Sequence, residues 1–208
     1  MPELPEIEAV RRRLGPRLEG RQVTQVSVNP RKGYMLRYPA DGLKSELPQR
    51  RIERVWRRGK HLVLDLLDAA GDRRHLVVNP MLGGRFHIGS SAAKPPGNWV
   101  FGLAVDGGDA MRYSDTRDMG RVYWAGDLER DVPGWTELGP EADSLADVGL
   151  DAFRRRLRRY RDAMKEVLRN QAFLAGLGNA YSDEILFEAG ILPLRRRASL
   201  TQDDEEAL

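Results

Sequence analysis

Hydrophobic and polar positions follow three successive patterns along the chain. From Pro5 to Leu18, hydrophobic side chains recur every three or four residues. This spacing predicts an amphipathic helix, with a kink or a break at Gly15-Pro16. From 22 to 124, short hydrophobic or alternating runs are separated by turn residues, a pattern typical of strands. The helical spacing then returns from 149 to the end of the chain, so we expect a β-rich part followed by an α-rich part.

The β-rich part contains about eight strands, a number of short elements that predicts a β-sandwich. Turn signals such as Asp41-Gly42, Gly83-Gly84 and Gly107-Gly108 separate the segments. The candidate segments are 22–28, 42–47, 51–56, 61–67, 75–78, 84–88, 99–105, 111–114 and 121–124.

The α-rich part begins after an acidic stretch rich in glycine and proline. We therefore expect an α+β protein with domains at 1–127 and 149–208 and a linker at 128–148. Helices are predicted over 150–160, 163–168 and 181–189.

A last helix is predicted to start at Thr201, where Asp204 stands three residues on, as in a capping box. It would have too few residues to be stable alone. We therefore expect that the chain is a fragment cut inside this element, while a naturally short protein remains the alternative.

The composition narrows the class of protein. With 41% hydrophobic and 31% charged residues, the chain is typical of a soluble globular protein. Hydrophobic runs stay short of the ~18–20 residues of a membrane span, and the start is unlike a signal peptide. The chain has no cysteine, and its three histidines lack metal-ligand spacing. We expect a cytoplasmic protein with no membrane segment, metal site or cofactor.

The charge distribution leaves two interpretations open. The net charge is only +3, but arginines cluster at 11–13, 57–58, 154–161 and 195–197. Such clusters suit a nucleic-acid partner. They are equally typical of solvated helix faces.

The first residues carry the clearest candidate chemistry. If Met1 is removed, Pro2 becomes a secondary amine with a pKa near ~8, so a part of it is unprotonated at neutral pH. Glu3, Glu6 and Glu8 follow closely. An amine beside carboxyl groups can attack an aldehyde-like carbon and form a Schiff base. The alternative is an ordinary acidic helix start.

Other motifs converge with this one. A lone lysine, Lys60, stands at the start of a hydrophobic strand, and two glycines open the segment Gly176 to Glu184. With Asp115 to Gly120 and Leu138 to Glu141, these motifs resemble the formamidopyrimidine-DNA glycosylase/endonuclease VIII family of base-excision repair enzymes. The likeness runs from Met1 to about Ser199.

The resemblance implies a fold and a reaction. A β-sandwich would join an α-helical domain with a helix–two-turns–helix motif, truncated here. Pro2 would attack C1′ of a damaged nucleotide, Glu3 would transfer protons, and Lys60 would contact the phosphate and the lesion. The implied protein is a monomeric, nucleoid-associated DNA glycosylase and AP lyase that acts on damaged double-stranded DNA.

The resemblance also assigns substrate-binding residues. Glu6 would lie near the base pocket. Leu82, Arg117 and Met119 would fill the space left when the damaged nucleotide is flipped out of the duplex. Further contacts to DNA would come from Lys165, Asn179 and Tyr181.

The chain departs from the family pattern at several positions. Asn79 replaces a family histidine, Trp99 lies in a segment that has lost its histidines, and Asp118 replaces a basic residue. We also find no counterpart of the family's four-cysteine zinc finger. These departures motivate a second hypothesis, a non-catalytic damaged-DNA-binding module on the same fold. A small N-terminal-proline enzyme such as a tautomerase is disfavoured by the length and by the motif at 176–184.

Overall fold

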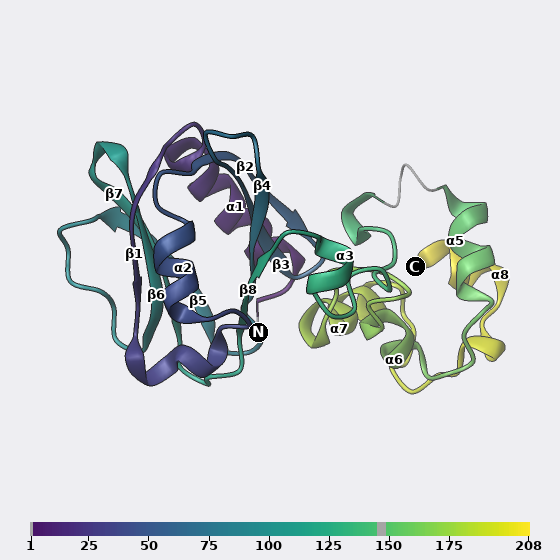
Figure 1. Ribbon diagram of the computed structural model, residues 1–208. Coiled ribbons are helices and arrows are strands. Elements are labelled where there is room, and N and C mark those ends of the chain that lie inside the picture. The colour runs from purple at the N-terminus through teal and green to yellow at the C-terminus, as the bar shows by residue number, and fades with distance from the viewer. Residues whose placement is uncertain (1, 145–148) are drawn as a thin grey trace. The chain divides into compact units, whose positions relative to one another are not determined.

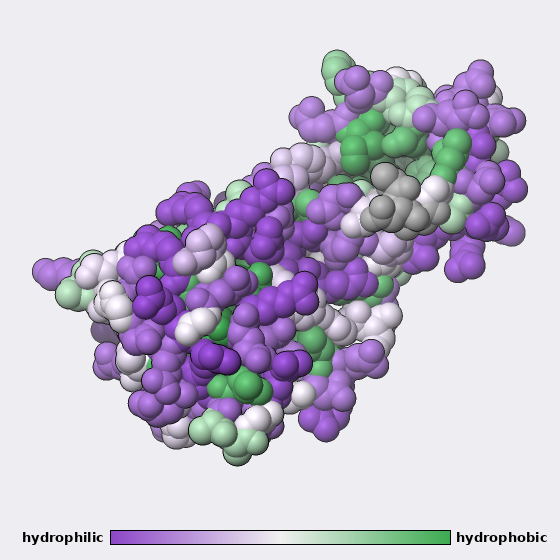
Figure 2. All heavy atoms as spheres, turned by 90° about the horizontal axis from the view of Figure 1, so that it is seen from above, coloured by the Kyte–Doolittle hydropathy of each residue, from purple (hydrophilic) through white to green (hydrophobic). Residues whose placement is uncertain are grey.

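The computed structural model describes residues 2–144 and 149–208 and contains two compact units, Met1–Trp135 and Thr136–Leu208. The division falls inside the stretch 128–148, for which we predicted a linker. Met1, whose removal we expect, and residues 145–148 of that stretch lie outside the described residues. Hydrophilic side chains cover most of the face shown in Figure 2. In the described part of the chain, no helix combines the length and the hydrophobicity needed to cross a bilayer.

The first unit contains two antiparallel four-stranded sheets that share one hydrophobic core (Figure 1). The first sheet has the order β1-β6-β7-β5, and the second has the order β2-β3-β4-β8. This arrangement confirms the predicted β-sandwich and the α+β class. The strands are β1 (Val23–Val28), β2 (Arg51–Arg58), β3 (His61–Leu67), β4 (Arg73–Asn79), β5 (Gly84–Ser90), β6 (Trp99–Val105), β7 (Asp109–Asp115) and β8 (Arg121–Ala125).

The second sheet is covered on both faces, which explains the continuous hydrophobic run in β3. Leu62 and Leu64 belong to the main core, whereas Val63 points to the other face and packs in a smaller cluster. That cluster is completed by the short helix α3 (Leu128–Asp131) and by Trp135. Residues just after the last strand therefore pack on the first unit.

Helix α1 (Leu4–Leu18) runs without a break through Gly15-Pro16, so of the kink or break that we predicted there, the break was wrong. Leu14 and Leu18 are buried on either side of the proline, at 2% and 0% exposure. A proline inside a helix costs about 3 kcal/mol, whereas burial of two leucines contributes about 1.5–3 kcal/mol each. Packing of the last turn therefore outweighs the lost backbone hydrogen bond.

The segment 42–47, which we predicted as a strand, is helical, and α2 spans Ala40–Glu46. Leu43 and Leu47 are four residues apart and both are 1% exposed, which is the spacing of one helix face. Gly42 permits the close approach of Tyr38, because a Cβ at this position would lie 2.6 Å from the tyrosine ring.

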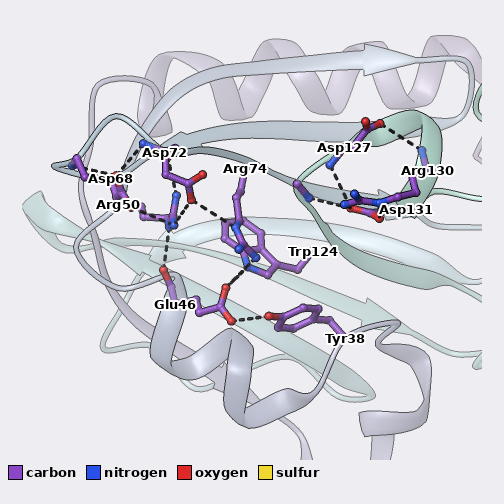
Figure 3. A network of polar contacts seen from close by, with 12 residues as sticks. Tyr38, Glu46, Arg50, Asp68, Asp72, Arg74, Trp124, Asp127, Arg130 and Asp131 are labelled. Atoms are coloured by element: carbon purple, nitrogen blue, oxygen red, sulfur yellow. Dashed lines mark hydrogen bonds and ion pairs between the residues drawn. The ribbon is translucent and has the colours of Figure 1, made fainter.

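A polar network joins α2 to the second sheet (Figure 3). Glu46 accepts hydrogen bonds from the Tyr38 hydroxyl and, at 2.9 Å, from Trp124 Nε1. It also pairs with Arg74 at 3.0 Å. The guanidinium groups of Arg50 and Arg74 lie 5.5 and 5.9 Å from the centroid of the Trp124 ring. The network holds a helix that the sequence pattern did not reveal.

The second unit is helical and has its own core, built around Phe153, Met164, Phe173 and Leu186. The predicted helices at 150–160, 163–168 and 181–189 are confirmed, with boundaries shifted by a few residues. The helices are α5 (Leu150–Leu157), α6 (Met164–Arg169), α7 (Asn179–Glu188) and α8 (Gln202–Ala207).

Charged contacts hold the short helix α8. The predicted capping box is confirmed, since Asp204 N–H donates to Thr201 Oγ1 at 3.2 Å. A double hydrogen bond from Arg195, at 2.9 and 2.6 Å, lowers the pKa of Asp204 to about 2. Arg154 of α5 pairs with Glu206 at 2.6 Å. Its side chain is only 13% exposed, so it joins two helices.

Candidate active site and nucleic-acid interface

The first turn of α1 fixes the position of Pro2. Glu3 is the N-cap residue and is 1% exposed, whereas Glu6 is exposed. The two form a capping box, in which Glu3 N–H donates to Glu6 Oε2 at 2.8 Å. These contacts anchor the peptide that follows Pro2, so the proline does not sit on a loose tail. The two carboxylates also have different surroundings, which separates their chemical roles.

A pocket of about 490 Å³ opens beside Pro2. Glu6 and Leu82 line it as well, and so do Arg85 and His87. Burial lowers the pKa of His87, and the charge of Arg85 acts in the same direction. Both effects favour the neutral form of this imidazole. The pocket has the size of a small-molecule site and brings together the proline predicted to carry the amine, a carboxylate and a hydrophobic side chain.

Lys60 lies in the two-residue turn between β2 and β3. Arg58 and His61 form the last pair of this hairpin, and Gly59 has φ +52°, in the left-handed region that favours glycine. Lys60 itself is half-buried. The short turn gives the lysine a defined starting point at one end of the second sheet.

Glu8 connects α1 to this hairpin, a role that its sequence position did not indicate. Hydrogen bonds from Arg11, then from Arg12, lower the pKa of Glu8 to about 2. The Glu8 carboxylate also lies 3.8 Å from Arg57 of β2, whose side chain is only 7% exposed. Arg57 in turn donates to the Gly59 carbonyl at 3.1 Å. The helix that carries Pro2 and the turn that carries Lys60 are thus linked through charged groups.

Leu82 lies in the turn between β4 and β5 and is 44% exposed. Met81 precedes it with φ +46°, an unusual backbone conformation for a residue with a side chain. Met81 N–H donates to Asn79 Oδ1 at 3.1 Å, which closes the turn. Gly84 is required behind it, because a Cβ there would lie 2.4 Å from the Tyr113 hydroxyl.

Arg117 and Met119 lie on a loop that is built around Asp115. The Asp115 side chain is fully buried. Its Oδ1 accepts backbone N–H groups of Arg117 and Asp118 at 2.8 and 3.0 Å. Its Oδ2 accepts that of Gly120 at 2.7 Å. The carboxylate thus organises the backbone of the residues predicted to enter the DNA.

Asp118 is paired inside this loop rather than presented alone to a partner. Lys32 Nζ lies 2.6 Å from its carboxylate and 2.7 Å from the Asp115 carbonyl oxygen. The hydrogen bond from Lys32, then that from Tyr34, lowers the pKa of Asp118. Sequence considerations treated Asp118 as a reversed charge near DNA. Its geometry makes it one half of a neutral pair.

In the second unit, the glycine segment before α7 is fastened by one side chain. Gln171 Oε1 accepts the Gly176 N–H at 3.0 Å, and its Nε2 donates to the Leu177 carbonyl at 2.7 Å. Gly176 has φ +106°. The next glycine, Gly178, is the N-cap of α7. The loop therefore arrives at the helix start in one defined conformation.

The three candidate residues of this unit lie near helix N-termini. Asn179 begins α7 and is exposed, while Tyr181 is half-buried against the core. The start of a helix attracts anions through its N–H groups and its dipole. Lys165 lies in the first turn of α6 and pairs with Asp183 of α7 at 2.7 Å. Its positive charge is therefore partly compensated within the unit.

The structure groups part of the predicted site and adds residues that we did not predict. Pro2, Glu6 and Leu82 share one pocket. A second group of residues shapes the loops and has no periodic signal in the sequence: Asp115, Lys32 and Gln171. The lysine–aspartate pair joins positions 86 residues apart, which only the fold brings together.

Two protein-family models match this chain. The model of the formamidopyrimidine-DNA glycosylase N-terminal domain matches residues 1–122. The model of the H2TH domain of the same enzyme matches residues 138–208. The first match contains Pro2, Glu3 and Lys60, and the second contains Asn179.

Whole-chain comparisons agree with these matches. The chain is 38% identical to formamidopyrimidine-DNA glycosylase of Moorella thermoacetica, over 98% of this chain and 73% of that protein. It is 35% identical to the enzyme of Geobacter metallireducens, over 100% of this chain and 75% of that protein. The chain thus spans about three quarters of the length of these relatives.

Solved structures are similar as well. The Lactococcus lactis formamidopyrimidine-DNA glycosylase, non-covalently bound to DNA with an AP site, superposes with a TM-score of 0.86. It is 27% identical and covers 99% of this chain and 76% of its own. A structure of MutM with DNA that contains carbocyclic 8-oxo-G gives a TM-score of 0.86 at 27% identity, over 99% and 74% of the two chains.

Proposed function

The chain belongs to the formamidopyrimidine-DNA glycosylase family, and from this premise we propose that it is a bifunctional enzyme of base-excision repair. It removes damaged bases from duplex DNA as a glycosylase, and it then cuts the strand as an AP lyase. The observation that supports Pro2 as its nucleophile is the pocket that Pro2 shares with Glu6 and Leu82.

The first chemical step is attack by the Pro2 amine, once Met1 is removed, on C1′ of the damaged nucleotide. A bond forms between the proline nitrogen and C1′, and the bond from C1′ to the base breaks. The base leaves with the bonding electron pair and takes up a proton, while the proline nitrogen gives up its own proton. Glu3 protonates O4′, so that the sugar ring opens and the proline nitrogen becomes an iminium. Glu3 directly follows Pro2 and is 1% exposed, so its carboxyl is shielded from bulk water.

The iminium makes the hydrogens on C2′ acidic, which leads to strand cleavage. Loss of a C2′ proton with departure of the 3′ phosphate is β-elimination. Loss of a C4′ proton in a second elimination releases the 5′ phosphate, and water then hydrolyses the iminium and regenerates Pro2. Water as the first nucleophile would release the base but form no imine. The amine is therefore what joins the two activities.

Binding of the substrate falls to residues in both units. Lys60 contacts the phosphate beside the lesion, and Leu82, Arg117 and Met119 fill the space that the flipped nucleotide leaves. Further phosphate contacts belong to the second unit. The candidates there are Asn179, Tyr181 and Lys165, the last of which exchanges its pair with Asp183 for a phosphate.

The zinc finger of the family needs four cysteine ligands, and none of these 208 residues is a cysteine. The residues present therefore do not fit that metal site. No step of the proposed reaction passes through a metal.

A non-catalytic damaged-DNA-binding module remains the second candidate. It was motivated by Asn79, Trp99 and Asp118, which depart from the family pattern. The pair between Asp118 and Lys32 removes part of that motivation, since the reversed charge is compensated.

Borohydride trapping tests the proposal. Hydride reduces the iminium to a stable amine, so an active chain becomes covalently joined to duplex DNA that contains an abasic site, 8-oxoguanine, a formamidopyrimidine or an oxidised pyrimidine. We expect a gel-shifted adduct, with mass spectrometry placing the link on Pro2. The control is the same chain with one residue added before Pro2, which should form no adduct until the extra residue is removed.

The outcomes separate the two candidates. Absence of an adduct from a chain whose N-terminus is Pro2 contradicts the enzymatic proposal. Tight binding of a duplex with an abasic-site analogue, without cleavage, would instead favour the damage-binding module.

A further inference from the structure

Three candidate loops leave the same end of the second sheet. Arg58 pairs with His61 across the β2–β3 hairpin, and Asn79 pairs with Arg121 between β4 and β8. The register of Leu62 opposite Val78 places His61 beside Asn79. The end of this sheet is therefore a row of four residues, each next to a loop that carries a proposed DNA-contacting side chain.

The two central residues of the row are hydrogen-bonded to each other. Asn79 Nδ2 lies 3.2 Å from His61 Nε2, and His61 Nδ1 lies 3.2 Å from the Arg58 carbonyl oxygen. Asn79 Oδ1 accepts the Met81 N–H at 3.1 Å. One side-chain connection thus runs from the turn of Lys60 to the turn of Leu82.

The direction of every hydrogen bond in this connection follows from one backbone group. Met81 N–H is a donor only, so it fixes which end of the Asn79 amide is the oxygen. The amide nitrogen then donates to His61 Nε2, which must carry a lone pair. The proton of the neutral imidazole therefore lies on Nδ1 and is donated to the Arg58 carbonyl.

The connection acts on a strained turn. Met81 has φ +46°, a conformation that is unfavourable for a residue with a side chain and persists only when its surroundings hold it. The hydrogen bond from Met81 to Asn79 is such a restraint, and it lies next to Leu82, which is 44% exposed. At the end of the row, Arg121 Nη1 donates to the carbonyl groups of Met119 and Gly120 at 2.5 and 2.8 Å.

We propose that His61 and Asn79 are positioning residues that couple the turn carrying Lys60 to the turn carrying Leu82. Filling of the gap in the duplex by Leu82 and the phosphate contact of Lys60 then occur in one geometry. The replacement of the family histidine by Asn79 then has a structural role, because the Asn79 amide completes the connection with His61. This inference rests on the proposed function of Lys60 and Leu82.

The test compares variants of the whole chain in single-turnover cleavage of a lesion duplex, with 2-aminopurine opposite the lesion to report gap filling. His61→Phe keeps an aromatic ring at this position and removes both imidazole nitrogens. We expect cleavage to fall about tenfold, with a matching loss of the fluorescence change. His61→Gln, whose side-chain oxygen can accept from Asn79, should recover most of both.

A double-mutant comparison isolates the coupling. In the chain with His61, the effects of Lys60→Met and Leu82→Ala on the cleavage rate should not multiply, because the two turns act together. In the His61→Phe background, the same two effects should multiply. Multiplying effects in both backgrounds would overturn the coupling.

The matched control is His75→Phe, another half-buried histidine of the second sheet, which contacts Asp65 at 2.7 Å. Equal cleavage rates of the His61→Phe and His75→Phe variants would contradict the proposal. It would also be contradicted if His61→Gln were no more active than His61→Phe while the two variants had equal thermal stability. Should His61→Phe fail to fold, Asn79→Ala takes its place, with the same expected losses. If the unaltered chain forms no borohydride adduct, the proposed function fails, whereas a trapped wild type with unaffected variants overturns only the positioning role.

Discussion

Two neighbouring loops carry the side chains proposed to fill the gap in DNA, and they are held in different ways. The loop 115–120 is built on a fully buried carboxylate and braced by a lysine. The Leu82 turn is held by a neutral amide that accepts one backbone N–H and by a backbone hydrogen bond from Gly84 N–H to the Pro80 carbonyl at 2.9 Å. Hydrogen bonds to an ionised group are about twice as strong as neutral ones. The side-chain hydrogen bonds that hold the first loop are therefore more numerous and stronger than the one that holds the second.

The largest effect is expected from removal of the carboxylate in the first loop. Asp115→Ala would leave three backbone N–H groups without their acceptor, those of Arg117, Asp118 and Gly120. We expect the free energy of unfolding, measured by urea denaturation, to fall by about 3 kcal/mol or more. Asp118→Ala removes an exposed carboxylate from the same loop and should cost about 1 kcal/mol or less. Similar losses for both variants would contradict the central role of Asp115.

A smaller effect is expected from Lys32→Met, and part of it should depend on pH. The hydrogen bond from Lys32 lowers the pKa of Asp118, so this pair stabilises the fold above the unfolded pKa of ~3.9 and is lost as pH falls through the folded pKa. The Asp118 side chain is 43% exposed, which limits the effect at pH 7 to about 1 kcal/mol.

Urea denaturation at pH 7, 5 and 3 measures this dependence. The difference between wild type and Lys32→Met should shrink below pH ~4. It should not vanish, because Lys32 also donates to the Asp115 carbonyl at 2.7 Å. A difference that grows on acidification would show that Asp118 is not the titrating partner.

The smallest effect concerns two residues with the same backbone strain. Met81 and Asp118 have φ +46° and +55°. Glycine relieves that strain but gains freedom in the unfolded chain, so Met81→Gly should change the free energy of unfolding by less than about 0.5 kcal/mol. Asp118→Gly also loses the contact with Lys32 and should destabilise by about 1 kcal/mol. Equal values in thermal or urea unfolding would remove the distinction between the loops.

Much of the fold was predictable from local pattern. Period-two and continuous hydrophobic runs located all eight strands of the first unit, and the Thr201–Asp204 capping box marked the start of α8. The helix α2 was missed because a pair such as Leu43 and Leu47 fits both periods over so short a segment. Of the kink or break predicted at Gly15-Pro16, the break was wrong because tertiary burial outweighed the local preference of proline.

The candidate site also contains residues that the sequence pattern identified and residues that it did not. Pro2 and Lys60 were identifiable because their chemistry depends on residue type and on motifs contiguous in the chain. From the sequence alone, Asp115 is indistinguishable from an ordinary turn residue, and His61 from an ordinary strand residue. Their roles arise from partners that lie far away in sequence or across a sheet.

The sequence by itself determined which groups can carry out the chemistry, because a nucleophile, an acid and a glycine-rich turn are local properties of residue type and spacing. Only the tertiary structure decided how those groups are held. The pairing of Lys32 with Asp118 and of His61 with Asn79 depends on strand register, which places residues in contact regardless of their separation along the chain.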